Sequence, residues 1–216
     1  KELPIESAAK IVSEMDSDDA VDVLEEMDAT TKHKIVGMLD KEASDDVRLL
    51  FSYDDDEIGS RMTTNFIMIH NHLTIRQAMR ELVEQAGEND NISTIYVIDE
   101  EDKFYGAIDL KDLIIAREYT DLEDIISHSY PYVMDHEKVS DCIDKIRDYA
   151  EDSIPVLQEN GTIAGIITSQ DIVEAVDDEM GDDYAKLAGL TAEEDLNETL
   201  PQSIKKRLPW LIVLLF

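Results

Sequence analysis

The strongest constraint on the fold is an internal repeat in the middle of the chain. The segment 95–98 aligns with 154–157 at an offset of 59. The same offset aligns Gly106 with Gly165, Ile108 with Ile167, Asp109 with Thr168 and Asp112 with Asp171. Upstream, an offset of 64 aligns Met62 with Ile126 and Ile75 with Val139. Two copies that stay in register from one end of the repeat to the other predict two examples of one structural unit.

Each copy predicts the element order β-α-β-β-α. An extended segment is followed by an amphipathic helix, two strands joined by a turn, and a closing helix. The predicted helices are 75–85 and 110–117 in the first copy and 139–149 and 169–176 in the second. Turn-forming residues at 101–102 and 160–161 separate the paired strands. This pattern predicts an α+β fold in which each sheet is covered by its own helices.

The segment 5–51, ahead of the repeat, shows the apolar spacing of short helices. Three related phrases follow one another at equal intervals, namely Met15-Asp16-Ser17, Met27-Asp28-Ala29 and Leu39-Asp40-Lys41. The candidate N-caps are Ser17, Thr30 and Ser44. We therefore predict a small all-helical domain built as a stack of helical hairpins.

The net charge narrows the class of partner. With 19 Lys and Arg against 51 Asp and Glu, the formal charge is −32. Such a chain repels a phosphate backbone and an anionic membrane surface, so no nucleic-acid partner is expected. Hydrophobic residues make up 43%, which is enough for a folded core. The single cysteine, Cys142, excludes an intramolecular disulfide and fits a reducing, intracellular compartment.

The C-terminal segment reverses this charge. No acid follows Glu198, and the basic residues 205–207 precede the apolar run 208–216, which contains Trp210. The run is shorter than the ~20 residues that span a bilayer. Basic residues and an interfacial aromatic are nevertheless typical of the cytoplasmic approach to a first transmembrane helix. The alternative is a C-terminal core helix or strand.

Two runs of acids lack the basic neighbours that normally accompany them. Residues 16–28 hold seven acids and residues 177–183 hold five, with no base in either. Asp18 and Asp22 lie one helical turn apart, where like charges destabilise a helix unless a cation is near. Mg²⁺ suits such a surface because it takes oxygen ligands and borrows only one or two carboxylates. No EF-hand loop and no zinc motif is present in the sequence.

The repeat resembles a tandem pair of CBS domains. The resemblance is carried by 154–157 and 165–172 in the second copy and by 105–113 in the first. The order of the whole chain resembles the cytosolic region of the MgtE family of magnesium transporters. The phrases that carry this wider resemblance are 18–22, 57–63 and 179–189.

The MgtE resemblance implies five segments. They are a helical N domain at 1–57, truncated at its start, a first CBS domain at 58–121, a second at 122–177, a long connecting (plug) helix at 178–207, and the start of a transmembrane helix at 208–216. It also implies a homodimer formed through the CBS domains and a transmembrane pore domain of the same protein. The chain is then the cytoplasmic portion of an integral protein of the inner membrane.

The family resemblance implies a function and a set of metal ligands. Mg²⁺ bound between the acidic domains would favour a compact closed state, so that the chain senses Mg²⁺ and gates a channel. The metal ligands implied are Asp18, Asp22, Ser60, Asp171, Glu179, Asp182 and Asp183. The alternatives are an ordinary first-turn acid for Asp18 and a solvated helix face for the last three.

An alternative function is a CBS regulatory module that binds an adenine nucleotide such as ATP. The CBS resemblance places this role on Lys111, Asp112, Thr168 and Asp171. A competing interpretation makes Thr168 and Asp171 the N-cap region of a helix. An enzyme is not expected, because the sequence has no Gly-rich phosphate loop and no Gly-x-Ser-x-Gly motif, and Cys142 lies on an amphipathic helix.

Overall fold

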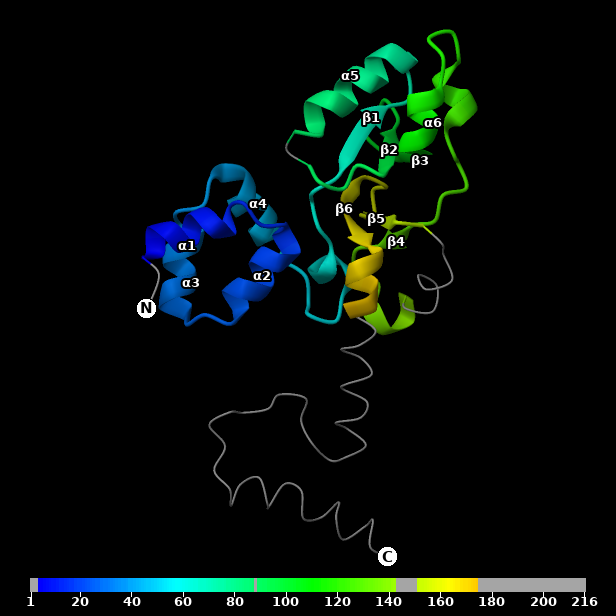
Figure 1. Cartoon of the computed structure of the whole chain (residues 1–216). Coiled ribbons are helices and arrows are strands. Elements are labelled where there is room, and N and C mark those ends of the chain that lie inside the picture. Colours follow the sequence, from blue (N-terminus) through cyan, green and yellow to red (C-terminus); the bar gives the residue numbers. More distant parts are fainter. Residues whose placement is uncertain (1–3, 88, 143–150, 175–216) are drawn as a thin grey trace, which may run out of the picture. The chain divides into compact units, whose positions relative to one another are not determined.

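The computed structural model describes residues 4–87, 89–142 and 151–174. The chain divides into two units, residues 1–171 and 172–216, and of the second only 172–174 are described. Four short helices open the first unit (Figure 1): α1 (Ile5–Val12), α2 (Ser17–Glu25), α3 (Ala29–Val36) and α4 (Lys41–Leu50). α1 packs on α3 and α2 on α4. The predicted stack of helical hairpins is therefore wrong, because each helix packs mainly on the next but one and not on its neighbour in the sequence. Their shared core is apolar and includes Val12, Val21, Leu24, Ile35, Val47 and Leu50.

Helices α2, α3 and α4 each begin directly after an aspartate. The Asp28 carboxylate accepts hydrogen bonds from the amides of Thr30 and Thr31, at 3.0 and 3.2 Å, and Asp40 accepts one at 2.9 Å. The predicted N-caps Ser17, Thr30 and Ser44 are therefore wrong, because all three lie within helices. The repeated phrase marks the true helix starts, since its central aspartate holds the N-cap position each time.

Two three-stranded sheets follow, one from each copy of the repeat. The first contains β1 (Ile67–His70), β2 (Thr94–Ile98) and β3 (Phe104–Asp109), and the second β4 (Val133–Met134), β5 (Ser153–Leu157) and β6 (Ile163–Thr168). In each sheet the first strand is parallel to the second and the third is antiparallel to it. The predicted α+β fold is confirmed.

Helices complete each copy. The first copy has α5 (Ile75–Gln85), as predicted, and α6 (Leu110–Ile115), which ends earlier than predicted. A short 3-10 helix precedes the first strand of each copy, η1 (Ile58–Arg61) before β1 and η2 (Leu122–Ile125) before β4. In the second copy residues 139–142 and 169–174 are helical. The predicted connecting helix and transmembrane start lie outside the described residues. Among those that are described, no helix is long and apolar enough to cross a membrane.

The register of the two sheets repeats the sequence offset. Val97 pairs with Gly106, and at the equivalent place in the second copy Val156 pairs with Gly165. A bulge follows at the same place in both hairpins. The predicted turns are confirmed, because each contains a residue of positive φ, 59° at Asp102 and 88° at Gly161.

The two copies exchange the segments that lead into them. Thr63, ahead of the first copy's β1, bridges to Ile166 in β6, and Ser127, ahead of β4, bridges to Ala107 in β3. The exchange obeys the sequence offsets, since 63 and 127 differ by 64 and 107 and 166 by 59. Each copy therefore completes the sheet of the other.

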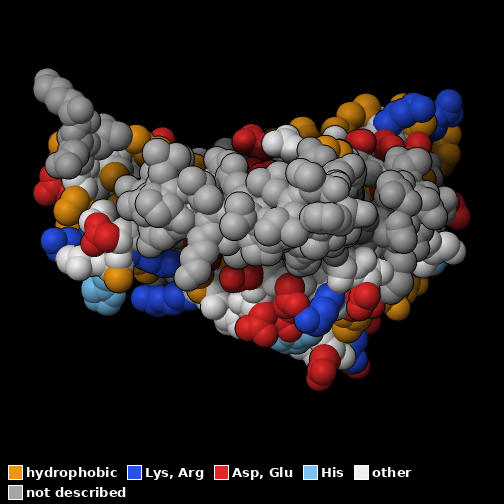
Figure 2. Space-filling model, turned by 90° about the horizontal axis from the view of Figure 1, so that it is seen from below, with side chains coloured by type: hydrophobic (Ala, Val, Ile, Leu, Met, Phe, Trp, Pro, Cys, Tyr) orange, Lys and Arg blue, Asp and Glu red, His pale blue; other side chains and the backbone are white. Residues whose placement is uncertain are grey.

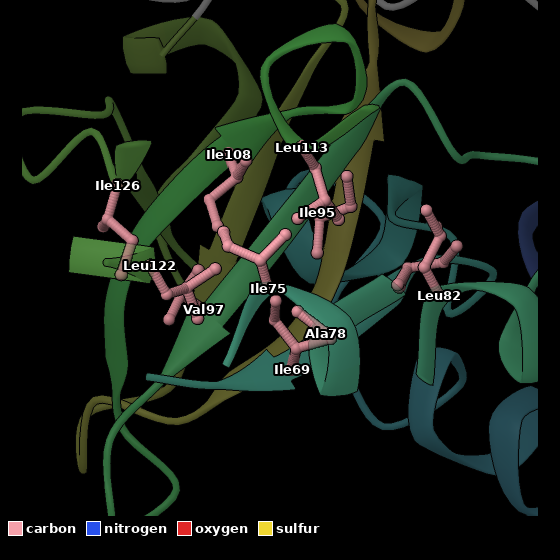
Figure 3. Packing of buried hydrophobic residues seen from close by; sticks show 11 residues of the cluster. Ile69, Ile75, Ala78, Leu82, Ile95, Val97, Ile108, Leu113, Leu122 and Ile126 are labelled. Atoms are coloured by element: carbon pink, nitrogen blue, oxygen red, sulfur yellow. The ribbon is translucent and has the colours of Figure 1, made fainter. Parts of the chain in front are cut away.

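The core of the first copy lies between its sheet and its two helices (Figure 3). Strand residues such as Ile69, Ile95 and Val97 meet Ala78 of α5 and Leu113 of α6. A second cluster joins the two copies and consists of Phe66, Tyr96, Ala107 and Ile166. Burial of these faces is the main favourable contribution to folding.

Alanine at either equivalent glycine should weaken the exchange. A Cβ at Gly106 would lie 2.6 Å from Ile126 Cγ2, and one at Gly165 would lie 2.8 Å from Met62 Sδ and from the Thr63 carbonyl oxygen. We expect Gly106→Ala and Gly165→Ala each to lower the free energy of unfolding by about 1–3 kcal/mol, because the close packing has no room for a methyl group.

Denaturant titration would measure this loss. Gly87→Ala is the matched control, because a Cβ there has no neighbour closer than 3.9 Å. Equal stability of all three variants would contradict the packing argument.

Candidate functional site

The start of α2 is held against the segment that leads into the first copy. Ser17 is 7% exposed, and its Oγ accepts hydrogen bonds from Thr64 N at 3.0 Å and from Thr64 Oγ1 at 3.2 Å. Asn65 donates from Nδ2 to Asp16 Oδ1 at 2.5 Å. The Asn65 side chain is itself fixed, because its Oδ1 accepts from the Asp90 amide at 2.8 Å. Helix α2 is thus attached through ordered polar contacts.

Asp18, one residue further along, carries an unusual carboxylate. Its Oδ1 is buried and has no hydrogen-bond partner in the described part of the chain. Burial raises the pKa of Asp18 to about 7, and the negative charge of Asp171 contributes to the rise. Near neutral pH this carboxyl group therefore accepts either a proton or a cation more readily than an ordinary aspartate.

Asp171 lies in the first turn of the helical segment 169–174, three residues after Thr168. Its Oδ2 accepts from Thr168 N at 2.8 Å, and its own amide donates to Thr168 Oγ1 at 3.4 Å. These are the reciprocal bonds of a helix N-terminus, so the N-cap interpretation of this pair is correct. Burial raises the pKa of Asp171 and the charges of Asp19 and Asp16 add to the rise, while the bonds to Thr168 oppose it.

The surface beside the attachment of α2 to Thr64 and Asn65 is also acidic. A pocket of about 310 Å³ is lined by residues of α1, α2 and α4 and of the first copy, with no Lys or Arg among them. Its acids are Glu14, Asp16, Asp40, Glu42, Asp46 and Asp90. Burial raises the pKa of Asp46 as well. Elsewhere, in Figure 2, acidic side chains gather on the described surface together with Lys, Arg and His side chains.

The other predicted metal ligands are placed differently. Asp22 is exposed on α2, and Ser60 lies in η1, where its hydroxyl donates to the Glu57 carbonyl oxygen at 2.8 Å. Glu179, Asp182 and Asp183 lie outside the described residues. Within 4–87, 89–142 and 151–174, no group of three or more His, Cys, Asp or Glu is arranged to hold a metal ion.

Two carboxylates fit a hydrated divalent ion better than a dehydrated one. The buried Oδ1 of Asp18 and the carboxylate of Asp171, whose charge acts on Asp18, offer hard oxygen donors to a metal ion. Mg²⁺ commonly keeps several waters and binds through one or two carboxylates. These residues therefore fit Mg²⁺ as ligands of a partly hydrated ion.

A third set of contacts fastens the connector 53–60, which contains the predicted ligand Ser60, to the second copy. Tyr53 donates from its hydroxyl to Asp135 Oδ2 at 3.1 Å, and Asp135 is only 4% exposed. Burial and this carboxylate raise the pKa of Tyr53 to about 12. The backbone amide of Gly59 donates to the Asp135 carbonyl oxygen at 2.8 Å. Gly59 is required here because a Cβ would lie 2.6 Å from the Tyr53 ring.

Ion pairs add to this connector contact. His136 Nδ1 lies 3.0 Å from Glu57 Oε1, and Lys138 pairs with Asp56. The signal in the sequence was the acidic run 54–57, which needs counterions, but the bases that supply them belong to the other copy of the repeat. Only a fold-level prediction could have joined the two.

Two of the candidate nucleotide residues, Asp112 and Asp171, occupy equivalent places in the two copies. Lys111 is exposed in the first turn of α6, beside Asp112, and the Asp109 carboxylate accepts from the Lys111 amide at 2.7 Å. Nearby, the Tyr130 hydroxyl donates to the Ser153 carbonyl oxygen at 2.8 Å. Burial raises the pKa of Tyr130 to about 12, and the acids Glu151, Asp152 and Asp109 contribute to the rise. These three acids would oppose a phosphate group placed near Tyr130.

Comparison with protein families agrees with this architecture. The model of the MgtE intracellular N domain matches residues 1–56, and the CBS domain model matches residues 56–119 and 122–178. The chain belongs to the MgtE family.

Curated magnesium transporters named MgtE are similar to this chain in sequence. The chain is 37% identical over 175 residues to the magnesium transporter MgtE of Enterococcus faecalis, covering 81% of this chain and 38% of that protein. It is 32% identical over 212 residues to the MgtE of Bacillus subtilis, covering 97% and 46%. The chain therefore spans less than half the length of these MgtE relatives.

Two solved structures are similar over most of the chain. The crystal structure of the soluble part of a magnesium transporter matches with a TM-score of 0.77 and 34% identity, covering 82% of this chain and 69% of that one. The cytosolic domain of the Mg²⁺ channel MgtE in complex with ATP matches with a TM-score of 0.71 and 26% identity, covering 80% and 76%.

The pair formed by His136 and Glu57 should make the connector contact depend on pH. The hydrogen bond to Glu57 and the charges of Asp135, Glu57 and Glu159 raise the pKa of His136 above its ordinary 6.5. Its contribution to stability is therefore complete below pH 6.5 and is lost as the pH rises through the folded-state pKa. We expect His136→Gln to remove part of the stability difference between about pH 6 and pH 8.

NMR titration of the histidine ring and thermal unfolding at the two pH values would measure this effect. Glu57→Gln should lower the pKa of His136, and His33→Gln, at an exposed position, is the control. A His136 pKa at or below 6.5 would disprove the ion pair.

Proposed function

We propose that this chain is the cytosolic regulatory region of a magnesium transporter, and that Mg²⁺ binding between α2 and the second CBS domain favours a compact, closed state. The observation that carries the proposal is the Asp18 carboxylate, whose Oδ1 is buried without a hydrogen-bond partner among the described residues and which feels the charge of Asp171. The proposal includes a membrane pore belonging to the same protein and a homodimer formed through the CBS domains.

Electrostatics supply the driving force. Two carboxylates held close together repel by on the order of 1–4 kcal/mol, between the limits of bulk water and a protein surface. Asp18 and Asp171 would hold the ion directly, and Asp22 and Ser60 would contribute through water. Further ligands are proposed in the predicted connecting helix, namely Glu179, Asp182 and Asp183. A bound Mg²⁺ supplies the positive charge that the contact lacks.

Linkage then couples the ion to the conformation. A site that exists only in the compact state stabilises that state by RT ln(1 + [Mg²⁺]/Kd). Several weak sites of this kind would give a steep response at cytosolic concentrations, because each adds to the same equilibrium. Release of α2 at low Mg²⁺ would free the connecting helix, and its movement would carry the signal to the pore.

Asp18→Asn should mimic the bound ion. A folded-state pKa of about 7 against an ordinary 3.8 means that stability falls as the pH rises from 3.8 to 7, and that the penalty is complete above 7. Asparagine has no charge, so at about pH 8 without Mg²⁺ the variant should be more stable by about 1–3 kcal/mol, allowing for partial solvent screening. Its gain in Tm on adding millimolar MgCl₂ should be smaller than that of the natural chain.

Thermal unfolding in EDTA and in MgCl₂ gives both quantities. Glu25→Gln, an exposed acid at the end of the same helix, is the matched control and should behave like the natural chain. An Mg²⁺-dependent gain that is unchanged in Asp18→Asn would refute this site.

A second candidate function is the binding of an adenine nucleotide. It is supported by the similarity to an MgtE cytosolic domain in complex with ATP. The residues proposed are Lys111 for phosphate, Asp112 for ribose hydroxyls, and the pair Thr168 and Asp171 in the second CBS domain. The acids around Tyr130 make the metal-bound nucleotide the expected form.

Thermal shift with ATP would test this second function. We expect ATP to raise the Tm and Lys111→Ala to lose at least half of that rise, because its ammonium group is the cation proposed to contact the phosphates. Lys41→Ala, on the exposed surface of α4, is the control. No rise in Tm with ATP in the natural chain would exclude nucleotide binding.

A further inference from the structure

The two CBS domains present equivalent ligand positions with different surroundings. The first position consists of Asp109 and Asp112, and the second of Thr168 and Asp171, which follow at an offset of 59. In each, a side chain at the end of the third strand caps the next helix. The repeat therefore predicts that a small ligand suited to one position would approach the other along the same path.

The segment leading into the first domain lies close to the second position. Thr63 pairs with Ile166, and β6 ends shortly afterwards at Thr168. The next two residues of the segment, Thr64 and Asn65, are the ones that hold α2 through Ser17 and Asp16. Through this attachment the first turn of α2 reaches the second position.

Charge and burial also place the first turn of α2 beside the position formed by Thr168 and Asp171. The charge of Asp171 acts on Asp18, and those of Asp16 and Asp19 act on Asp171. Ser17 is 7% exposed, and the Oδ1 of Asp18 is buried. Three acids and one serine at the start of α2 are thus gathered near Thr168 and Asp171.

The first position has other neighbours. An offset of 64 places His128 and Ser129 where the other half has Thr64 and Asn65. His128 contacts residues of the CBS pair itself, with Nε2 lying 3.0 Å from Glu123 Oε1 and Nδ1 3.4 Å from the Tyr105 carbonyl oxygen. The two ligand positions of the CBS pair therefore have different surroundings, because α2 is attached beside the second position only.

We propose that the first turn of α2 covers the second CBS position, so that a small molecule reaches Thr168 and Asp171 only when the N domain is released. The N domain then acts as an internal occupant of one of two equivalent positions. In the docked state only the first position is open to a ligand. If Mg²⁺ favours docking, as in the proposed function on which this consequence rests, the ion also closes the second position.

Cysteine labelling of the whole chain tests the cover directly. Thr168→Cys places a thiol at the second position, and the native Cys142 is fully buried and gives little background. Ser17→Arg replaces a buried serine with a side chain too large for the contact with Thr64 and should release α2. Glu25→Arg makes the matched control, because it introduces the same residue at an exposed position at the other end of α2.

We expect a small thiol reagent to label Thr168→Cys at least about tenfold faster with Ser17→Arg than with Glu25→Arg, which corresponds to about 1.4 kcal/mol of docking. Thr64→Val removes the hydroxyl bond to Ser17 with little change of shape and should give a smaller increase in the same direction. Equal labelling rates in all backgrounds would overturn the proposal.

Magnesium separates this proposal from the proposed function. MgCl₂ should slow labelling in the Glu25→Arg background and leave the Ser17→Arg background unchanged. If Ser17→Arg accelerates labelling but MgCl₂ has no effect, the cover stands and the magnesium function fails. If MgCl₂ stabilises the chain without any labelling difference, the function stands and the cover is refuted.

Discussion

The exchange of lead-in segments between the two CBS domains is the constraint on which the rest of the structure depends. Thr63 joins β6 and Ser127 joins β3, so neither sheet is complete without the other copy. The glycines Gly106 and Gly165 let these segments approach closely. Because Thr64 and Asn65 follow Thr63 directly, the same exchange places the two residues that attach α2. The path along the chain from sheet pairing to the candidate metal site is therefore very short.

The fold neutralises its acids in different ways. Asp28 and Asp40 are stabilised by helix N-termini, where amide groups and the helix dipole favour negative charge. Glu57 has His136 as a partner. Asp18 and Asp171 have neither a basic partner among the interactions described nor a fully solvated environment. Part of the net charge of −32 is therefore left without a described counterion at Asp18 and Asp171.

Local patterns were predictable and long-range contacts were not. The offset of 59 in the sequence anticipated the register of both hairpins, and periodicity predicted both bounds of α5. The N-caps were placed wrongly because Ser and Thr were preferred over the aspartate preceding each helix. The contact of Tyr53 with Asp135 joins two distant parts of the chain and has no local signature. The burial of the Asp18 Oδ1 atom was equally hidden, since its neighbour Asp19 has the same side chain and is exposed.

The raised pKa of Asp18 means that either a proton or a magnesium ion can relieve the repulsion between Asp18 and Asp171. Below a pH of about 7 the carboxyl group is protonated, and the contact with Asp171 loses most of its repulsion without any metal. Above that pH the repulsion returns, and a divalent ion has more to gain by binding there. The affinity of such a site for Mg²⁺ therefore rises with pH until the proton is fully released. Under the proposed function, the response to magnesium would be strongest at neutral or slightly alkaline pH, because the proton no longer relieves the repulsion there.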